Sequence, residues 1–108
     1  PDVLIGRSTH ALAQLREAVA DGCDYVGVGP VNATPTKPGR EPVGLDYVRQ
    51  AAAESPIPFF AIGGIDAGNL QAVLSAGGRR VAVVRAITEA PDPERAAQQL
   101  LQQLELRP

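Results

Sequence analysis

The sequence predicts an α/β fold in which four β-α units follow one another along 108 residues, which is enough for one domain. Four short apolar runs are typical of strands: VLIG at 3–6, YVGVG at 25–29, FFAIGG at 59–64 and VAVVRAI at 81–87. Each run is continuous rather than alternating, as in parallel strands that are covered on both faces. A helical pattern follows each run, and this alternation predicts a parallel sheet.

The helical segments carry recognisable start and stop signals. HALAQLREAVADG ends at Gly22, a residue type that favours the position just after a helix. GLDYVRQAAAES follows the second run, and DAGNLQAVLSAGG follows the third with Asp66 as its expected N-cap. The last segment, DPERAAQQLLQQLEL, is expected to begin with Asp92 as cap and Pro93 as first helical residue.

The loops indicate which parallel fold is present. Those that follow strands are rich in polar chemistry: RSTH, GPVNATPTKPGREPVG, GGIDAG and RAITEAPD. Those that return to strands are plain: DGCD, SPIP and GGRR. A doubly wound sheet concentrates its chemistry near one switch point, whereas a (β/α)₈ barrel places it after every strand. We therefore predict about half of a (β/α)₈ TIM barrel.

Composition excludes several classes of protein. The formal charge of −2 and the scattered basic residues do not suggest a nucleic-acid surface. No apolar stretch approaches the roughly 20 residues that cross a bilayer. Cys23 is the only cysteine, so no disulfide forms within one chain. We expect a soluble cytoplasmic protein. Because the chain enters a strand with neither leader nor methionine, we expect residues 1–108 to be part of a longer protein.

A phosphate site is predicted at the paired glycines of GGI, residues 63–65. Glycines let a backbone N–H group approach an anion without a Cβ in the way. The loops after the last two barrel strands commonly bind phosphate, so Gly64 and the backbone of Val84 and Arg85 would form a cup. A tight turn without function explains Gly-Gly equally well.

The loop TPTK at 34–37 offers two hydroxyl groups and one ammonium group on a backbone restricted by proline. Thr34, Pro35, Thr36 and Lys37 would suit a phosphate or a diphosphate, whose oxygens accept many hydrogen bonds. An ordinary solvent loop has a similar composition, and the pattern is not a P-loop.

Ser8 and His10 lie in RSTH, at the end of the first run. Ser8 would either cap the following helix or bind an anion at its positive end. His10, the only histidine, is either a surface group or an acid–base group at a strand end. No pair of acidic residues has metal-like spacing, so we predict no metal site in this chain.

IGRSTH, DYVGVGPVNATPTKPG, PVGLDYVRQAA, FFAIGGID and RRVAVVRAI, in this order, closely resemble the C-terminal half of thiamine-phosphate synthases. The resemblance implies strands 5 to 8 of a barrel enzyme, a transferase of thiamine biosynthesis. Such enzymes join an aminopyrimidine methyl diphosphate to a thiazole phosphate, releasing diphosphate. They use Mg²⁺, whose aspartate ligands would lie in the first half of the barrel, outside this chain.

The resemblance also implies roles for individual residues. Ser8 and Lys37 would bind the pyrimidine diphosphate. The thiazole phosphate would be bound by Thr34, Pro35, Thr36, Gly64, Val84 and Arg85, the last three through backbone amides. Asn32 stands where an apolar or aromatic residue is common, and Arg85 stands where some relatives carry Ser.

Alone, the chain is expected to be inactive, and to self-associate or pair with the missing half-barrel through its open sheet edges. Three alternatives remain at this point. One is the related thiazole tautomerase, in which His10 would be the acid–base group. The second is a phosphate-binding half-barrel without catalysis. The third is another phosphate-binding barrel, which would share GGI but not TPTK.

Overall fold

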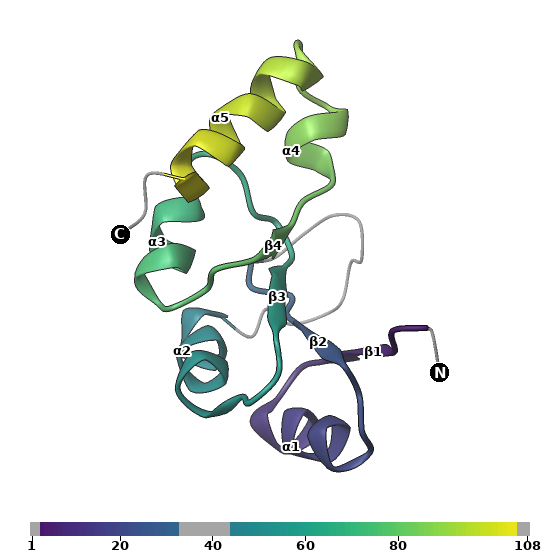
Figure 1. Ribbon diagram of the computed structural model, residues 1–108. Helices are drawn as coiled ribbons and strands as arrows, with labels where there is room; N and C mark the ends of the chain where they lie inside the picture. Colours follow the sequence, from purple (N-terminus) through teal and green to yellow (C-terminus); the bar gives the residue numbers. More distant parts are fainter. Residues whose placement is uncertain (1–2, 33–43, 106–108) are drawn as a thin grey trace.

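The computed structural model describes residues 3–32 and 44–105, which form a parallel sheet with flanking helices (Figure 1). The strands, in their order across the sheet, are β1 (Gly6–Thr9), β2 (Tyr25–Val28), β3 (Phe59–Ile62) and β4 (Val81–Ala82). The helices are α1 (Leu12–Ala20), α2 (Gly44–Glu54), α3 (Leu70–Ser75), α4 (Arg85–Thr88) and α5 (Pro93–Glu105). Strands in sequence order with helices between them form a barrel wall, whereas a doubly wound sheet reverses its order. The predicted α/β architecture is confirmed.

The first strand was predicted at 3–6, which is wrong: β1 begins at Gly6 and has the polar sequence GRST. Residues 3–5 precede the ladder and are 71, 74 and 56% exposed. The register with β2 determines the strand, since Gly6 pairs with Tyr25 and each following residue pairs in turn. Backbone pairing therefore outweighs the apolar run, as is common for strand propensity.

The last strand was predicted at 81–87, and this too is wrong. β4 contains only Val81 and Ala82, and α4 starts at Arg85. β3 is the only partner of β4 in the described sheet, and their ladder ends where Ile62 pairs with Ala82. Gly63 follows with a φ of 111°, so the chain leaves the strand direction after Ile62. The residues after Ala82 then have no strand partner in β3.

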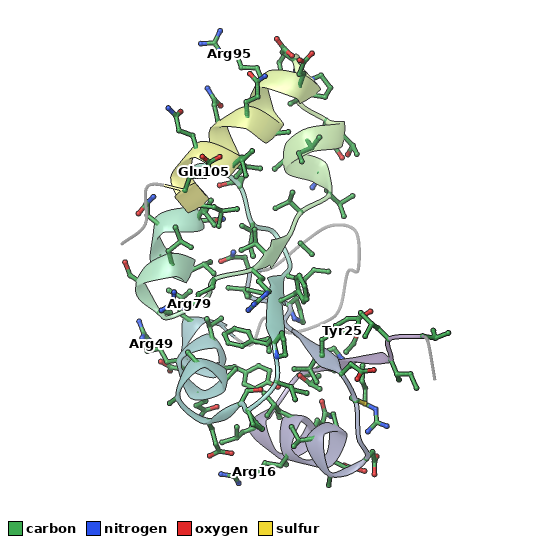
Figure 2. All side chains as sticks on the ribbon, in the orientation of Figure 1. Arg16, Tyr25, Arg49, Arg79, Arg95 and Glu105 are labelled. Carbon is green, nitrogen blue, oxygen red and sulfur yellow. The ribbon has the colours of Figure 1, made fainter. Side chains whose placement is uncertain are left out.

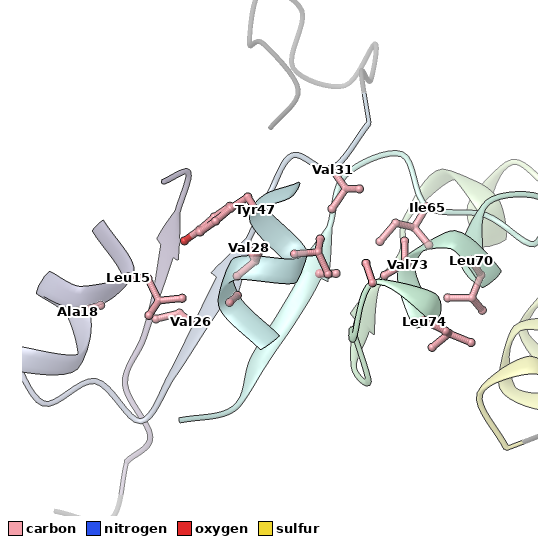
Figure 3. Packing of buried hydrophobic residues seen from close by; sticks show 14 of the residues in the cluster. Leu15, Ala18, Val26, Val28, Val31, Tyr47, Ile65, Leu70, Val73 and Leu74 are labelled. Carbon is pink, nitrogen blue, oxygen red and sulfur yellow. The ribbon is translucent and has the colours of Figure 1, made fainter. Parts of the chain in front are cut away.

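The hydrophobic core lies between the sheet and the helices (Figure 3). Val26, Val28 and Ala61 point to this side and are fully buried. One polar network crosses the core: Thr9 Oγ1 donates to the carbonyl of Gly27, and the Tyr47 hydroxyl donates to Thr9 Oγ1. This network joins β1, β2 and α2. Burial raises the pKa of Tyr47 above its usual value, because the charged phenolate is poorly solvated there.

The other face of the sheet is open in the described chain, as expected of half a barrel that lacks the strands needed to enclose its interior. Tyr25, Phe60 and Ile62 point to this face and are 37, 37 and 41% exposed. The rings of Tyr25 and Phe60 meet edge to face, with centroids 5.7 Å apart. In a closed barrel this face would be the interior.

Most of the predicted helix boundaries are confirmed. Gly22 follows α1 with a φ of 85°, and Asp92 caps α5 by accepting the N–H of Arg95 at 3.1 Å. Asp66 does not cap α3, whose N-cap is Asn69. Its carboxylate instead accepts the N–H groups two and three residues later, at 2.8 and 3.0 Å. Asp66 thus orders the turn before α3.

Replacing Tyr47 with Phe should lower the unfolding free energy by about 1 kcal/mol at neutral pH, because Thr9 loses one hydrogen-bond donor. The raised pKa means that the folded state keeps the Tyr47 proton after the unfolded chain begins to lose it, near pH ~10. The unaltered chain therefore has its full excess of unfolding free energy over Tyr47→Phe below about pH 10, and this excess declines as the pH rises further.

Urea unfolding at neutral pH and above pH ~10 measures both effects. Tyr25→Phe is the matched control, because it removes the other tyrosine hydroxyl from an exposed position and should cost under about 0.5 kcal/mol. A Tyr47→Phe difference that stays constant with pH would contradict this account.

Candidate phosphate site

The polar segments predicted to bind ligands follow the carboxyl ends of four neighbouring parallel strands. His10 follows β1, the segment 29–32 follows β2, the segment 63–65 follows β3 and the segment 83–85 follows β4. Because all four strands run in the same direction, these segments meet at one edge of the sheet. This edge is where barrel enzymes carry their chemistry.

The ends of β2 and β3 approach each other backbone to backbone. The N–H of Val31 donates to the carbonyl of Ile62 at 2.9 Å. A Cβ placed on Gly63 would lie 2.6 Å from the Cα of Pro30. A Cβ placed on Gly29 would lie 2.1 Å from the carbonyl oxygen of Ile62. Only glycine fits at these two positions without displacing the main chain.

The turn that follows β3 is built from Gly63 and Gly64, whose φ angles are 111° and 62°. Side-chain amides from two sides hold its carbonyl groups. Asn69 Nδ2 donates to the carbonyl of Gly64 at 2.8 Å, and Asn32 Nδ2 lies 3.3 Å from the same oxygen. Asn69 is itself held, because its Oδ1 accepts the N–H of Asp66 at 2.9 Å. Gly64 is exposed, as an anion-binding turn requires.

His10 joins the loop after β1 to the end of β2. Its Nδ1 lies 2.7 Å from the carbonyl oxygen of Gly29, which can only accept a hydrogen bond. Nδ1 therefore carries a proton and donates it to this carbonyl, and Nε2 is the other ring nitrogen. The backbone N–H of His10 donates to Gln14 Oε1 at 2.7 Å. The half-buried ring thus has one nitrogen occupied and one available.

Ser8 is exposed on the open face of the sheet. It pairs in register with Gly27, and Gly27 pairs with Phe60, so the three residues point to the same side. The sequence left a helix-capping role open for Ser8, and that role is wrong. Helix α1 has Ala11 at its N-cap and no side-chain cap. The hydroxyl group of Ser8 therefore faces the side that would be the barrel interior.

Val84 and Arg85 lie where β4 passes into α4. Val84 is the N-cap residue and its side chain is exposed. The guanidinium group of Arg85 makes two hydrogen bonds to the carboxylate of Glu89, at 2.6 and 2.7 Å. This contact raises the pKa of Arg85 and lowers that of Glu89. The charge of Arg85 is therefore already paired with Glu89, the residue that follows α4.

Four of the predicted site residues, Thr34, Pro35, Thr36 and Lys37, lie outside the described residues. Two residues in the described part were missed as site residues by the sequence reasoning, namely Asn32 and Asn69. Asn69 follows the diglycine turn by only five residues, and that spacing was the available signal. Asn32 was noted only as a departure from an apolar position, not as a hydrogen-bond donor to the turn.

Other kinds of site find little support in the described residues. Across 3–32 and 44–105, no three His, Cys, Asp or Glu side chains are grouped so that they could hold a metal ion. These described residues therefore offer no ligand set for Mg²⁺. No described helix is long and apolar enough to span a membrane. Arg16, Arg49, Arg79 and Arg95 are spread over the outside of the molecule and form no single basic patch (Figure 2).

Comparison with known proteins identifies close relatives. The family model described as "Thiamine monophosphate synthase" matches residues 1–87. The thiamine-phosphate synthase of Gloeobacter violaceus is 60% identical over 104 residues, which are 96% of this chain and 30% of that protein. A thiamine-phosphate synthase of Thermus thermophilus is 59% identical over 102 residues, which are 94% of this chain and 50% of that protein.

Solved structures agree with these relatives. The thiamine phosphate pyrophosphorylase from Pyrococcus furiosus superposes with a TM-score of 0.88 at 34% identity, over 98% of this chain and 50% of that one. A 3-hexulose-6-phosphate synthase superposes with a TM-score of 0.63 at 25% identity, over 88% of this chain and 46% of that one. This chain thus spans half or less of the length of the relatives named here.

Proposed function

Since the chain belongs to the thiamine monophosphate synthase family, we propose that it supplies the C-terminal half of a barrel that makes thiamine phosphate. The barrel would couple an aminopyrimidine methyl diphosphate with a thiazole phosphate. The observation that carries this proposal is the contact between the end of β2 and the diglycine turn after β3. The two loops expected to bind the substrates begin within a few residues of that contact.

The proposed roles divide the residues between the two substrates. Ser8 faces the interior side and would contact the pyrimidine diphosphate together with Lys37. The thiazole phosphate would be held by Thr34, Pro35, Thr36, and by backbone amides of Gly64, Val84 and Arg85. An anion at the last three positions would need no free cation, because backbone N–H groups carry partial positive charge. The guanidinium group of Arg85 would not be needed there, and it is already paired with Glu89.

The proposed reaction exchanges one bond for another. The C–O bond between the pyrimidine methylene and diphosphate breaks, and its electron pair leaves with the diphosphate. The lone pair of the thiazole nitrogen then forms the new C–N bond to the methylene carbon. The chain's own task would be to align the two substrates and to offset the charge of the leaving group, which is the part assigned to Lys37.

The reaction as written needs no side chain to transfer a proton. One ring nitrogen of His10 is already bound to the carbonyl of Gly29. We propose that His10 supports the end of β2 rather than transferring a proton. Mg²⁺, where the reaction needs it, would be bound by residues of the other half-barrel. Without that half the chain should not catalyse the reaction.

A chimera tests the proposal. The half of the Thermus thermophilus synthase that this chain does not match is joined to this chain, and thiamine phosphate formation is measured. We expect activity, and we expect Lys37→Ala to lower kcat about 10²–10³-fold, because a donor to the leaving group is lost. Arg95→Ala is the control, since it removes a cation from the exposed surface of α5 and should leave the rate unchanged.

Two outcomes would contradict the proposal. One is an active chimera in which Lys37→Ala leaves kcat unchanged, as Arg95→Ala should. That result would show that Lys37 does not act at the site. The other is isomerisation of the thiazole without thiamine phosphate formation. Loss of that isomerisation in His10→Ala would assign a tautomerase instead.

We also propose that the isolated chain self-associates through the open face of its sheet. Tyr25, Phe60 and Ile62 leave apolar area uncovered there. Within the described sheet, β1 and β4 each have one unpaired edge. A two-fold axis parallel to the strands would place β4 of each copy beside β1 of the other, in parallel, and close eight strands.

Light scattering after size-exclusion chromatography should therefore give twice the mass of the chain at micromolar concentration. Ile62→Glu places a charge on the open face and should shift the chain to a monomer. Leu101→Glu is the control, because Leu101 is an exposed apolar residue on α5, away from that face. A monomeric unaltered chain would refute the proposed association.

A further inference from the structure

Asn32 makes three contacts with the diglycine turn of the neighbouring loop. Its backbone N–H donates to the carbonyl of Gly63 at 3.1 Å. Its side-chain Nδ2 lies 3.4 Å from the same oxygen and 3.3 Å from the carbonyl of Gly64. Both partners are acceptors only, so the amide must present its NH₂ group to them. One side chain from the end of β2 therefore bridges two successive carbonyls after β3.

These contacts determine where the N–H groups of the turn point. A trans peptide is planar, and its C=O and N–H point in opposite directions. Holding the carbonyl of Gly63 therefore directs the N–H of Gly64 away from Asn32. Holding the carbonyl of Gly64, which Asn69 shares at 2.8 Å, does the same for the N–H of Ile65. Neither of these two N–H groups donates to another residue in the described part of the chain.

Two successive N–H groups in a turn form a concavity that suits an anion. Gly64 is exposed, whereas Ile65 is only 3% exposed, so an anion would approach from the Gly64 side. The turn has no side chain of its own to hold this shape, because both of its residues are glycine. Glycine also loses the most conformational freedom on ordering, so an unsupported turn would bind an anion weakly. External support is therefore a requirement of this particular site.

We propose that Asn32 is a positioning residue that pre-organises the Gly64 and Ile65 amides for a phosphate group. The inference rests on the proposed function, because the anion would be the phosphate of the thiazole substrate. Asn32 would not touch the ligand. It would act through the carbonyl groups on the far side of the two peptide planes, and would thereby couple the end of β2 to the phosphate site.

Amide resonances of the full 108-residue chain test this, with inorganic phosphate as the probe. In the unaltered chain, phosphate should shift the Gly64 and Ile65 amides. Asn32→Leu has a similar size and no donors. It should weaken phosphate binding about fivefold to tenfold, and should move the two amide resonances even without phosphate. Asn32→Gln keeps the donors and should recover part of the affinity.

Gln50→Leu is the matched control, because it removes an exposed amide from α2 and should change neither reading. If Asn32→Leu does not fold, Asn32→Ser is the substitute, because its shorter side chain also removes the contacts with the carbonyls of Gly63 and Gly64. Phosphate binding that is equal in the unaltered and Asn32→Leu chains overturns the positioning role and leaves the phosphate site intact. An unaltered chain whose Gly64 and Ile65 amides ignore phosphate overturns the phosphate site, and with it both proposals.

Discussion

The ends of β2 and β3 touch main chain to main chain, and the arrangement of the candidate site depends on this contact. Ladder pairing holds the two strands in register up to Ala61, and the hydrogen bond from Val31 to Ile62 continues the contact beyond the strand ends. Side chains at positions 29 or 63 would separate the two loops. Glycine at both positions lets the loop after β2 approach the diglycine turn and bring Asn32 within reach of its carbonyls.

The fold separates the packed core from the polar loops. Helices cover one face of the sheet, where the core and the Thr9–Tyr47 hydrogen bond lie. The other face stays open, and the polar loops gather at the carboxyl edge. This division leaves most polar residues of the strand ends outside the core, while Val31 and Ile65 of the same segments join it. It also explains why an apolar face remains uncovered in a chain that spans half or less of its named relatives.

Much of this was predictable from the sequence, and the failures have identifiable causes. The four β-α units and the polar edge followed from alternating patterns and loop composition, which are local properties. The limits of β1 and β4 did not, because the register with a neighbouring strand determines them. Asp66 was misplaced since a turn intervenes before α3. The contacts of Asn32 could not be predicted, because its partners Gly63 and Gly64 lie about 30 residues away in sequence.

The backbone contact is tested most directly by comparing two glycine-to-alanine variants in urea unfolding. Gly22 and Gly63 both have positive φ, at 85° and 111°, so alanine is strained at either position. An added Cβ at Gly22 meets no atom within 4 Å, whereas at Gly63 it meets Pro30. We predict that Gly22→Ala costs about 1–2 kcal/mol, and that Gly63→Ala costs about 1–3 kcal/mol more. Equal costs would show that the two strand ends are not held in contact, and would contradict the account.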